Sequence, residues 1–354
     1  MPQTATHPPE RPSGRSLQLI LKAGPQKPAE PLPMWEAFLH SINCVLILIL
    51  LAGAGYWTAH KGWYDQNATA LVARLVTFLS LPCYLFSSVM SKLNHDELLA
   101  LAGSMITPFA SIWLCFFVSR IIVRVFKVSS VHSGVFSSAF SATNNMFIGV
   151  PVSLALFGEE AIIPTLLYFF ANTTFFWTMG NYLEAMDGIA ATKQKAPKAF
   201  SLATVKRVFS PPLCGFLAAI ILILLDMRLP EPVMEAARYM GGITSPLALI
   251  FIGIMIYNIG IRNIRITKDL ALVLLGRFVI CPTVCLAFTA VLPLSPLFAK
   301  VYVIQAALPC ITQIAVLARF HHADVKFSTM AVASTTLLSV VSLPVWMMIL
   351  TALE

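Results

Sequence analysis

The stretch FSSAFSATNNMFIGVPVSLALFG, residues 136–158, decides the fold class of this chain. It is long and apolar enough to cross a bilayer, yet it contains four polar or helix-breaking residues: Asn144, Asn145, Gly149 and Pro151. Lipid offers no hydrogen-bond partners, so such residues are tolerated at membrane depth only where protein or a water-filled cavity surrounds them. The stretch therefore predicts a broken membrane helix that contributes to an interior site.

The composition of the whole chain agrees with a lipid environment. Hydrophobic residues make up 58% of the 354 residues, charged residues make up 11%, and the mean hydropathy is +0.79. Soluble domains carry about 25% charged residues, so this chain could not cover a soluble surface. The formal net charge of +8 does not indicate nucleic-acid binding, because the basic residues sit in short clusters between apolar stretches.

Ten apolar segments are long enough to span a membrane, which takes about 20 residues each. They lie at 36–57, 69–91, 98–124, 133–157, 161–184, 209–227, 240–260, 270–293, 297–320 and 328–352. Continuously apolar segments indicate helices, so we predict an all-α membrane protein with ten transmembrane helices. We expect the polar, proline-rich residues 1–33 to be a disordered tail, and a translation start at Met34 is an open alternative.

Basic residues also predict the topology. Lys and Arg are concentrated in alternate loops, including those around Arg120 and Lys195. Basic loops stay in the cytoplasm, which places residues 185–208 inside and both termini outside the plasma (inner) membrane. This loop separates residues 34–184 from residues 209–354, with five segments in each part. An odd number of segments makes the two parts inverted repeats, as in many transporters.

The segments at 133–157 and 297–320 occupy equivalent places in the two repeats, and both look broken. The second contains Gln305, Pro309, Thr312 and Gln313. Proline removes a helix donor, and paired breaks in matching segments point to a binding site. Crossing breaks would direct two helix N-termini at one place, which favours an anion. The alternative is a structural kink stabilised by amide bonds between helices.

Three further polar residues are second-rank site candidates: Asn172, Arg277 and Gln305. A charge inside a span suggests function, but Arg277 could also reach the interface or pair with carbonyls. We expect Glu184, at the end of its segment, to be a solvated helix end. No Asp or Glu is then left at the midplane, so a proton relay through a buried carboxylate has no candidate.

The sequence contains none of the common catalytic motifs that we looked for. The chain has no HExxH, GxSxG or P-loop motif. Cys281 and Cys285 share a helix face, but no His or third Cys is near, which favours packing over metal binding. We therefore expect no enzymatic activity, no cofactor and no metal site.

Several stretches resemble a known family. NNMFIGVPVSLALFG, residues 144–158, resembles the NTLVMGxPL-type stretch of PIN-type auxin efflux carriers, and QAALPCITQIAVLARFHH, residues 305–322, resembles their QAALP-containing helix. LVTFLSLPCYLF, RFVICPTV and STTLLSVVSLPVW look like the auxin efflux carrier family at large, whose bacterial members move small carboxylates. The resemblance runs over nearly the whole chain, from about residue 34 to residue 353.

The resemblance implies a ten-helix fold with crossed, broken helices 4 and 9, external termini and a cytoplasmic central loop. The crossover asparagine of the family matches Asn144, and its crossover proline matches Pro309. Ile314 stands where PIN carriers have a second proline, and Gln313 stands where bacterial relatives often carry asparagine. These departures and the short central loop favour a carboxylate smaller than auxin.

The expected function is thus secondary transport of a small organic anion. Two alternatives stay open: a sodium-coupled anion symporter of the bile-acid type, and a membrane receptor that has lost transport. The expected partners are the anion and membrane lipid, with no nucleic acid, and a homodimer is a further open alternative.

Overall fold

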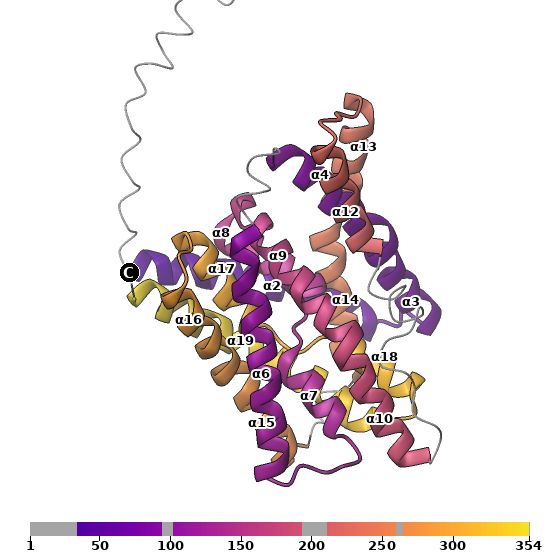
Figure 1. Ribbon diagram of the computed structural model, residues 1–354. Coiled ribbons are helices and arrows are strands. Elements are labelled where there is room, and N and C mark those ends of the chain that lie inside the picture. Colours follow the sequence, from indigo (N-terminus) through magenta and orange to yellow (C-terminus); the bar gives the residue numbers. More distant parts are fainter. Residues whose placement is uncertain (1–33, 94–101, 193–210, 260–264, 354) are drawn as a thin grey trace, which may run out of the picture.

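The computed structural model describes residues 34–93, 102–192, 211–259 and 265–353 (Figure 1). The predicted tail at 1–33 and residues 193–208 of the predicted loop lie outside this described part. Within it the chain is helical, and its one β-type contact is an isolated bridge between Thr143 and Cys310. The expectation of an all-helical protein is confirmed for these residues.

The α-helices follow one another as α2 (Met34–His60), α3 (Gln66–Leu75), α4 (Leu81–Lys92), α6 (Ile106–Val125), α7 (Ser133–Ser141), α8 (Val150–Phe157), α9 (Ile162–Phe175), α10 (Asn181–Thr192), α12 (Pro211–Leu224), α13 (Glu231–Gly242), α14 (Thr244–Ile259), α15 (Lys268–Leu275), α16 (Cys281–Val291), α17 (Pro296–Ala306), α18 (Gln313–Phe320) and α19 (Val325–Ala352). Short 3₁₀ turns, η2 (Ala102–Met105) and η4 (Glu159–Ala161), precede α6 and α9.

Several of these helices join into longer rods. Five continuous helices in the described part are long and apolar enough to cross a membrane: Asn67–Lys92, Gly103–Val125, Glu231–Asn258, Lys268–Val291 and Val325–Ala352. They make the chain an integral membrane protein. The fourth and ninth predicted segments are interrupted, as expected, so neither forms one long helix.

The seventh segment begins earlier than the sequence predicted. We expected it to start at residue 240, but α13 already begins at Glu231 and continues into α14 with one interruption at Ile243. The turns of α13 carry Glu235 and Arg238, and such charges hide an amphipathic helix from a search for purely apolar stretches. The fifth segment is likewise longer, because α10 continues to Thr192 and makes the first part of residues 185–208 helical.

Three π-helical turns explain how prolines fit inside the long rods. The turns η1 (Val76–Ser80), η3 (Asn145–Gly149) and η7 (Gly276–Ile280) each end two residues before a proline: Pro82, Pro151 and Pro282 respectively. Proline cannot donate to the preceding turn and clashes with its carbonyl, and a widened π turn relieves that clash. Pro151 therefore lies in a helix that continues, not at a break. A fourth π turn, η5 (Phe176–Gly180), joins α9 to α10 without a proline.

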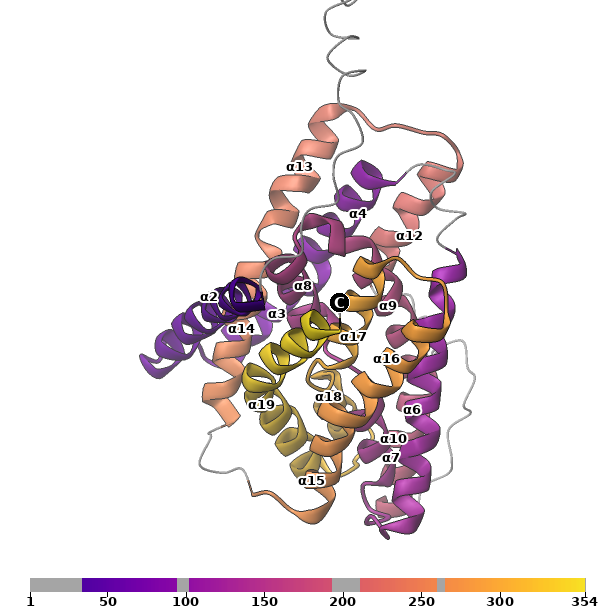
Figure 2. The same cartoon turned by 90° about the vertical axis from the view of Figure 1, so that its left-hand side faces the viewer.

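The helices form two groups, which Figure 2 separates. The smaller group contains α2, α3, α4, α12, α13 and α14, in which α2 packs along α14 and α4 packs against α12 and α13. The remaining helices, α6 to α10 and α15 to α19, form the larger group, which holds most of the fully buried side chains. Both interrupted segments belong to this larger group.

Candidate functional site

The two interrupted segments meet in the middle of the larger group. Between α7 and η3 the chain is extended at residues 142–144, and between α17 and α18 it is non-helical at residues 307–312. The two stretches run antiparallel: the amide of Asn144 donates to the carbonyl of Pro309 at 2.9 Å, and that of Ile311 donates to the carbonyl of Ala142 at 3.1 Å. Unwound backbone away from water needs such partners, so each break supplies the bonds that the other lacks. We call this place the crossing.

Pro309 lies in its break, as the sequence predicted. Pro151, one of the residues that led us to predict a broken helix, does not lie at the first break, because the break ends at Asn144 and Pro151 follows seven residues later within α8. The local cause of the first break is the pair Thr143 and Asn144, whose backbone bonds go to other segments. Asn144 adopts φ −85° and ψ 63°, and its side-chain oxygen accepts from the amide of Phe147 at 3.3 Å as an N-cap.

Asn172 on α9 fixes the first break in place. Its side-chain oxygen accepts from the amide of Thr143 at 2.8 Å, and its side-chain nitrogen donates to the carbonyl of the same residue at 2.9 Å. The side chain thus imitates a neighbouring β-strand. Both of its polar atoms are used in this way, so Asn172 positions the crossing.

Arg277 in η7 binds the ends of both preceding half-helices. Its guanidinium is fully buried, with 0% exposed. It donates to the carbonyl of Phe140 at 2.6 Å near the end of α7, and to the carbonyls of Ala306 at 2.6 Å and Leu308 at 3.1 Å at the end of α17. Helix C-termini carry partial negative charge and unpaired carbonyls, which a cation with several donors satisfies. Of the two interpretations of Arg277, pairing with carbonyls is therefore the observed one, and the side chain does not reach the interface.

A second amide pair closes the crossing on the η3 side. Asn145 donates to the side-chain oxygen of Gln305, and Gln305 donates to the carbonyl of Gly149 at 3.0 Å and the hydroxyl of Ser153 at 2.7 Å. Asn145 also accepts from the hydroxyl of Thr143 at 2.7 Å. Gly149 is required here because a Cβ at that position would lie 2.5 Å from the Gln305 side-chain oxygen. The side-chain amides of Asn145 and Gln305 bond mainly to each other and to nearby groups of the protein, as expected for a structural kink stabilised by amide bonds between helices.

Asn144 differs from the other amides. Its side chain is 1% exposed, and its side-chain nitrogen has no hydrogen-bond partner among the described residues. A buried amide donor without a partner costs roughly 1–3 kcal/mol, which is a reason to look for a missing ligand. The donor lies at the N-terminus of η3. Thr312 and Gln313 begin α18 on the other strand of the crossing, are half-buried, and bond to each other at 3.4 Å.

An apolar cavity lies between the two helix groups and reaches η3. It has a volume of about 270 Å³ and is bounded by α2, α14, α8 and α19, with Ile148 and Val152 on the side nearest the crossing. The walls are almost entirely hydrocarbon. Polar donors at the crossing and apolar walls beside it are the combination found at many small-molecule sites.

Sequence reasoning missed some residues of this region. Thr335 on α19 accepts from the amide of Cys310 at 3.3 Å, and Ser153 receives Gln305. Both are ordinary small polar residues in apolar helices, so only their position in the fold shows their role. The expectation for Glu184 is wrong: it is not a solvated helix end but has 0% exposed. It lies where α10 packs against α7 and α18, so the helix end that the sequence assigned to solvent is covered.

Comparison with known proteins decides the family. A model of the membrane transport protein family, that of the auxin efflux carriers, matches residues 40–347. This chain belongs to that family. It is 26% identical over 324 residues to an uncharacterized transporter of Methanothermobacter thermautotrophicus, covering 88% of this chain and 99% of the relative. It is 20% identical over 312 residues to an uncharacterized transporter of Methanocaldococcus jannaschii, covering 86% and 97%. The expected family is thus confirmed, and membership supports a transport function.

Proposed function

We propose that this family member is a secondary transporter of a small organic anion, such as a dicarboxylate, a hydroxy acid or an auxin-like acid. The anion binds at the crossing and is carried by alternating access. One observation carries the proposal: the buried side-chain nitrogen of Asn144 has no partner in the described part of the chain and lies at a helix N-terminus where two broken segments cross.

The charges at the crossing suit a carboxylate that must bind and then leave. The N-termini of η3 and α18 supply partial positive charge, each worth typically 0.3–1 kcal/mol and up to ~2 kcal/mol when partly buried. Arg277 adds a positive charge near the crossing, and each of its three nitrogens donates to a backbone carbonyl. The donor that has no partner among the described residues is the neutral amide of Asn144, which holds an anion less tightly than a guanidinium would. The apolar cavity beside η3 would receive the hydrocarbon part of the acid.

The architecture we propose around this site keeps ten spans in two inverted repeats, with both termini outside the plasma (inner) membrane. Helix α19 offers a matched test because exposed residues lie at its two ends, Lys326 and Leu353. In a cysteine-free background, a membrane-impermeant thiol reagent added to intact cells should label Leu353→Cys and spare Lys326→Cys. Labelling of position 326 alone would reverse the orientation and contradict the proposed topology.

The transport itself is tested in proteoliposomes that contain the purified protein. Radiolabelled malate, succinate, lactate and indole-3-acetate serve as probes in counterflow, with Asn144→Asp as the defective variant. We expect saturable exchange of at least one probe by the wild type and its loss in the variant, because a second negative charge would occupy the anion position. Exchange that requires sodium would favour the bile-acid-type symporter. Binding without exchange would favour the receptor, and neither binding nor exchange of any probe would contradict the proposal.

A further inference from the structure

Glu184 has a buried carboxyl group that plays no part in the proposed anion site. Its side chain is fully buried, and neither carboxylate oxygen has a hydrogen-bond partner among the described residues. An isolated carboxylate away from water costs far more free energy than the neutral acid, so burial without partners favours the protonated form. A buried ionisable group inside a membrane protein is a functional candidate by default.

The helices around Glu184 are closely packed, and the side chain that interacts with its carboxyl group from α7 is the hydroxyl of Ser138. A Cβ at Gly134 on α7 would lie 2.2 Å from the carbonyl of Leu183, and a Cβ at Gly188 on α10 would lie 1.8 Å from the carbonyl of His321. The backbones of α7 and of the residue that follows α18 therefore touch α10 on either side of Glu184. These two helices are the halves of the broken segments on this side of the crossing.

A line of small hydroxyls connects Glu184 with the crossing. Ser138 and Ser141 are three residues apart on α7, which places them on one helix face. The hydroxyl of Ser138 donates to the carbonyl of Gly180, one turn before Glu184, at 3.4 Å. The hydroxyl of Ser141 is buried and has no partner in the described structure, like the side-chain nitrogen of Asn144 just beyond it.

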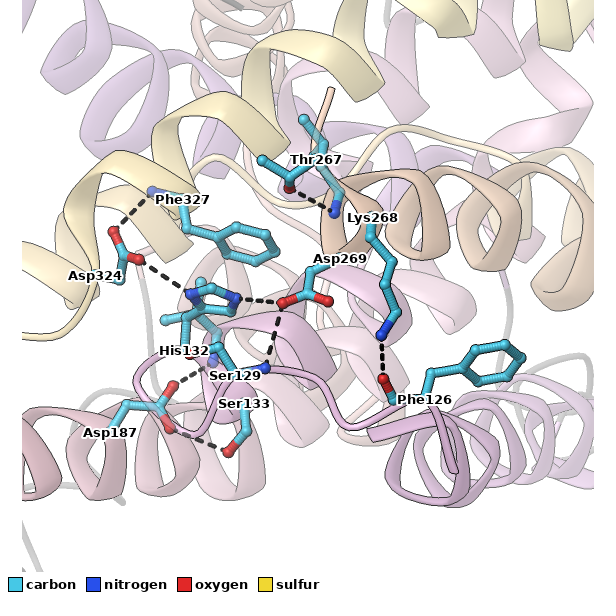
Figure 3. A network of polar contacts seen from close by, with 12 residues as sticks. Phe126, Ser129, His132, Ser133, Asp187, Thr267, Lys268, Asp269, Asp324 and Phe327 are labelled. Carbon is cyan, nitrogen blue, oxygen red and sulfur yellow. Dashed lines mark hydrogen bonds and ion pairs between the residues drawn. The ribbon is translucent and has the colours of Figure 1, made fainter. Parts of the chain in front are cut away.

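The other titratable groups near Glu184 do not neutralise it. Asp187, three residues later on α10, accepts from the amides of Gly134 at 2.7 Å and Val135 at 2.8 Å (Figure 3 shows the surroundings of Asp187). Burial raises the pKa of Asp187 to about 6, and these bonds oppose the rise. On the α18 side, Arg319 is exposed and His321 bonds to Asn181 at 2.9 Å. Helix α7 itself contains no titratable residue.

Figure 3 shows a network of charged and polar side chains around His132. His132, just before α7, stacks on Phe327 and places its two ring nitrogens 3.0 Å from Asp269 and 3.0 Å from Asp324. Carboxylate oxygens only accept, so a ring that carries both protons satisfies both contacts. Asp269 lies in the first turn of α15, and Asp324 is the N-cap of α19. Both ring nitrogens of His132 thus contact the carboxylates of Asp269 and Asp324.

We propose that Glu184 is a proton-binding site that couples the uptake or release of a proton to anion transport. This rests on the proposed function. One proton binds a carboxylate oxygen of Glu184 to give the neutral acid, and one monoanion binds at the crossing. With Glu184 ionised, its charge opposes the anion; with Glu184 protonated, that repulsion is gone. Proton and anion therefore strengthen each other's binding, as linkage requires, and a monoanion with one proton crosses without net charge.

The first test does not need a substrate. Infrared spectra of the purified protein in lipid should contain the carbonyl stretch of a buried protonated carboxyl group that persists at neutral pH. Glu184→Gln should remove that band, and Glu160→Gln, which makes the same change at an exposed carboxyl group, should leave it. An unchanged band in Glu184→Gln, or no such band in the wild type, would overturn the proposal. This outcome is independent of whether any probe is transported.

The second test measures coupling in proteoliposomes with a pH-sensitive dye inside, using the anion probe that the wild type exchanges. A gradient of one pH unit should drive about tenfold accumulation of a monoanion, because one proton accompanies each anion. In Glu184→Gln, exchange at equal pH should persist while pH-driven accumulation and the dye signal are lost. Proton movement with the anion in Glu184→Gln would overturn the proposal. Failure of the wild type to exchange any probe would instead count against the proposed function.

Discussion

Replacing Arg277 should lower the stability of the protein, because this side chain ties the two broken segments of the crossing together. The guanidinium holds carbonyls at the ends of α7 and α17. Arg277→Met would remove its bonds to the carbonyls of Ala306 and Leu308 and leave that of Phe140 with only the weak thiol donor of Cys281. An unmet buried polar group costs roughly 1–3 kcal/mol. Removing one partner of a buried charged interaction typically costs about 3–5 kcal/mol. Here the release of the desolvated guanidinium charge offsets part of the cost of the unpaired carbonyls. We expect the free energy of unfolding to fall by about 3–5 kcal/mol.

The assay is the apparent melting temperature of the purified protein in one detergent, which should fall by roughly 5–15 °C. Arg277→Lys keeps the charge, but one ammonium nitrogen cannot reproduce a planar guanidinium that reaches two helices. The melting temperature of Arg277→Lys should therefore lie between those of the wild type and Arg277→Met. Arg319→Met is the matched control, because Arg319 is exposed. An Arg277→Met protein that melts with the wild type would refute the idea that Arg277 ties the half-helices together.

Three further substitutions probe the crossing from other directions. Gly149→Ala should lower yield and anion affinity together, because its Cβ would displace Gln305; normal binding would show that the neighbouring amide moves freely. Asn172→Leu should cost about 1–3 kcal/mol of stability by leaving the backbone of Thr143 unpaired, measured as a lower melting temperature; a stable protein would contradict the clamp. Pro309→Ala should reduce transport far more than expression, because the second break can then close into helix; normal flux would make the proline dispensable.

The breaks themselves could be predicted from the sequence, because amides, glycine and proline are costly inside an apolar segment that forms one uninterrupted helix. The position of the first break could not. Pro151 looks like the breaking residue, but a π turn accommodates it, and the break is set by backbone bonds from Asn144 and Thr143 to other segments. Such bonds are between residues far apart in the chain, and local propensity does not contain them.

The roles of the polar residues were also beyond the sequence. Asn144 and Asn172 are the same chemical group at similar apparent depth, yet Asn172 uses both polar atoms on the backbone while Asn144 has a donor without a partner among the described residues. Glu184 is similar: closeness to a loop suggested solvent, whereas α7 and α18 cover it. Burial and partnership depend on which helices meet, so only the packed structure separates a site residue from a structural one.

The measurement that tests the central claim most directly is the affinity of purified Asn144→Ala for the exchanged anion, taken together with its melting temperature. One hydrogen bond to a charged group is worth roughly 1.5–3 kcal/mol, so affinity should fall by about 10- to 150-fold. Stability should fall by no more than about 0.5–2 kcal/mol, the usual cost of losing an N-cap, because the side-chain oxygen of Asn144 caps η3 while its side-chain nitrogen has no partner within the described part of the protein. Asn67→Ala, which removes an exposed amide, is the control and should bind as the wild type does. Unchanged affinity with a lowered melting temperature would remove Asn144 from the site and contradict the account.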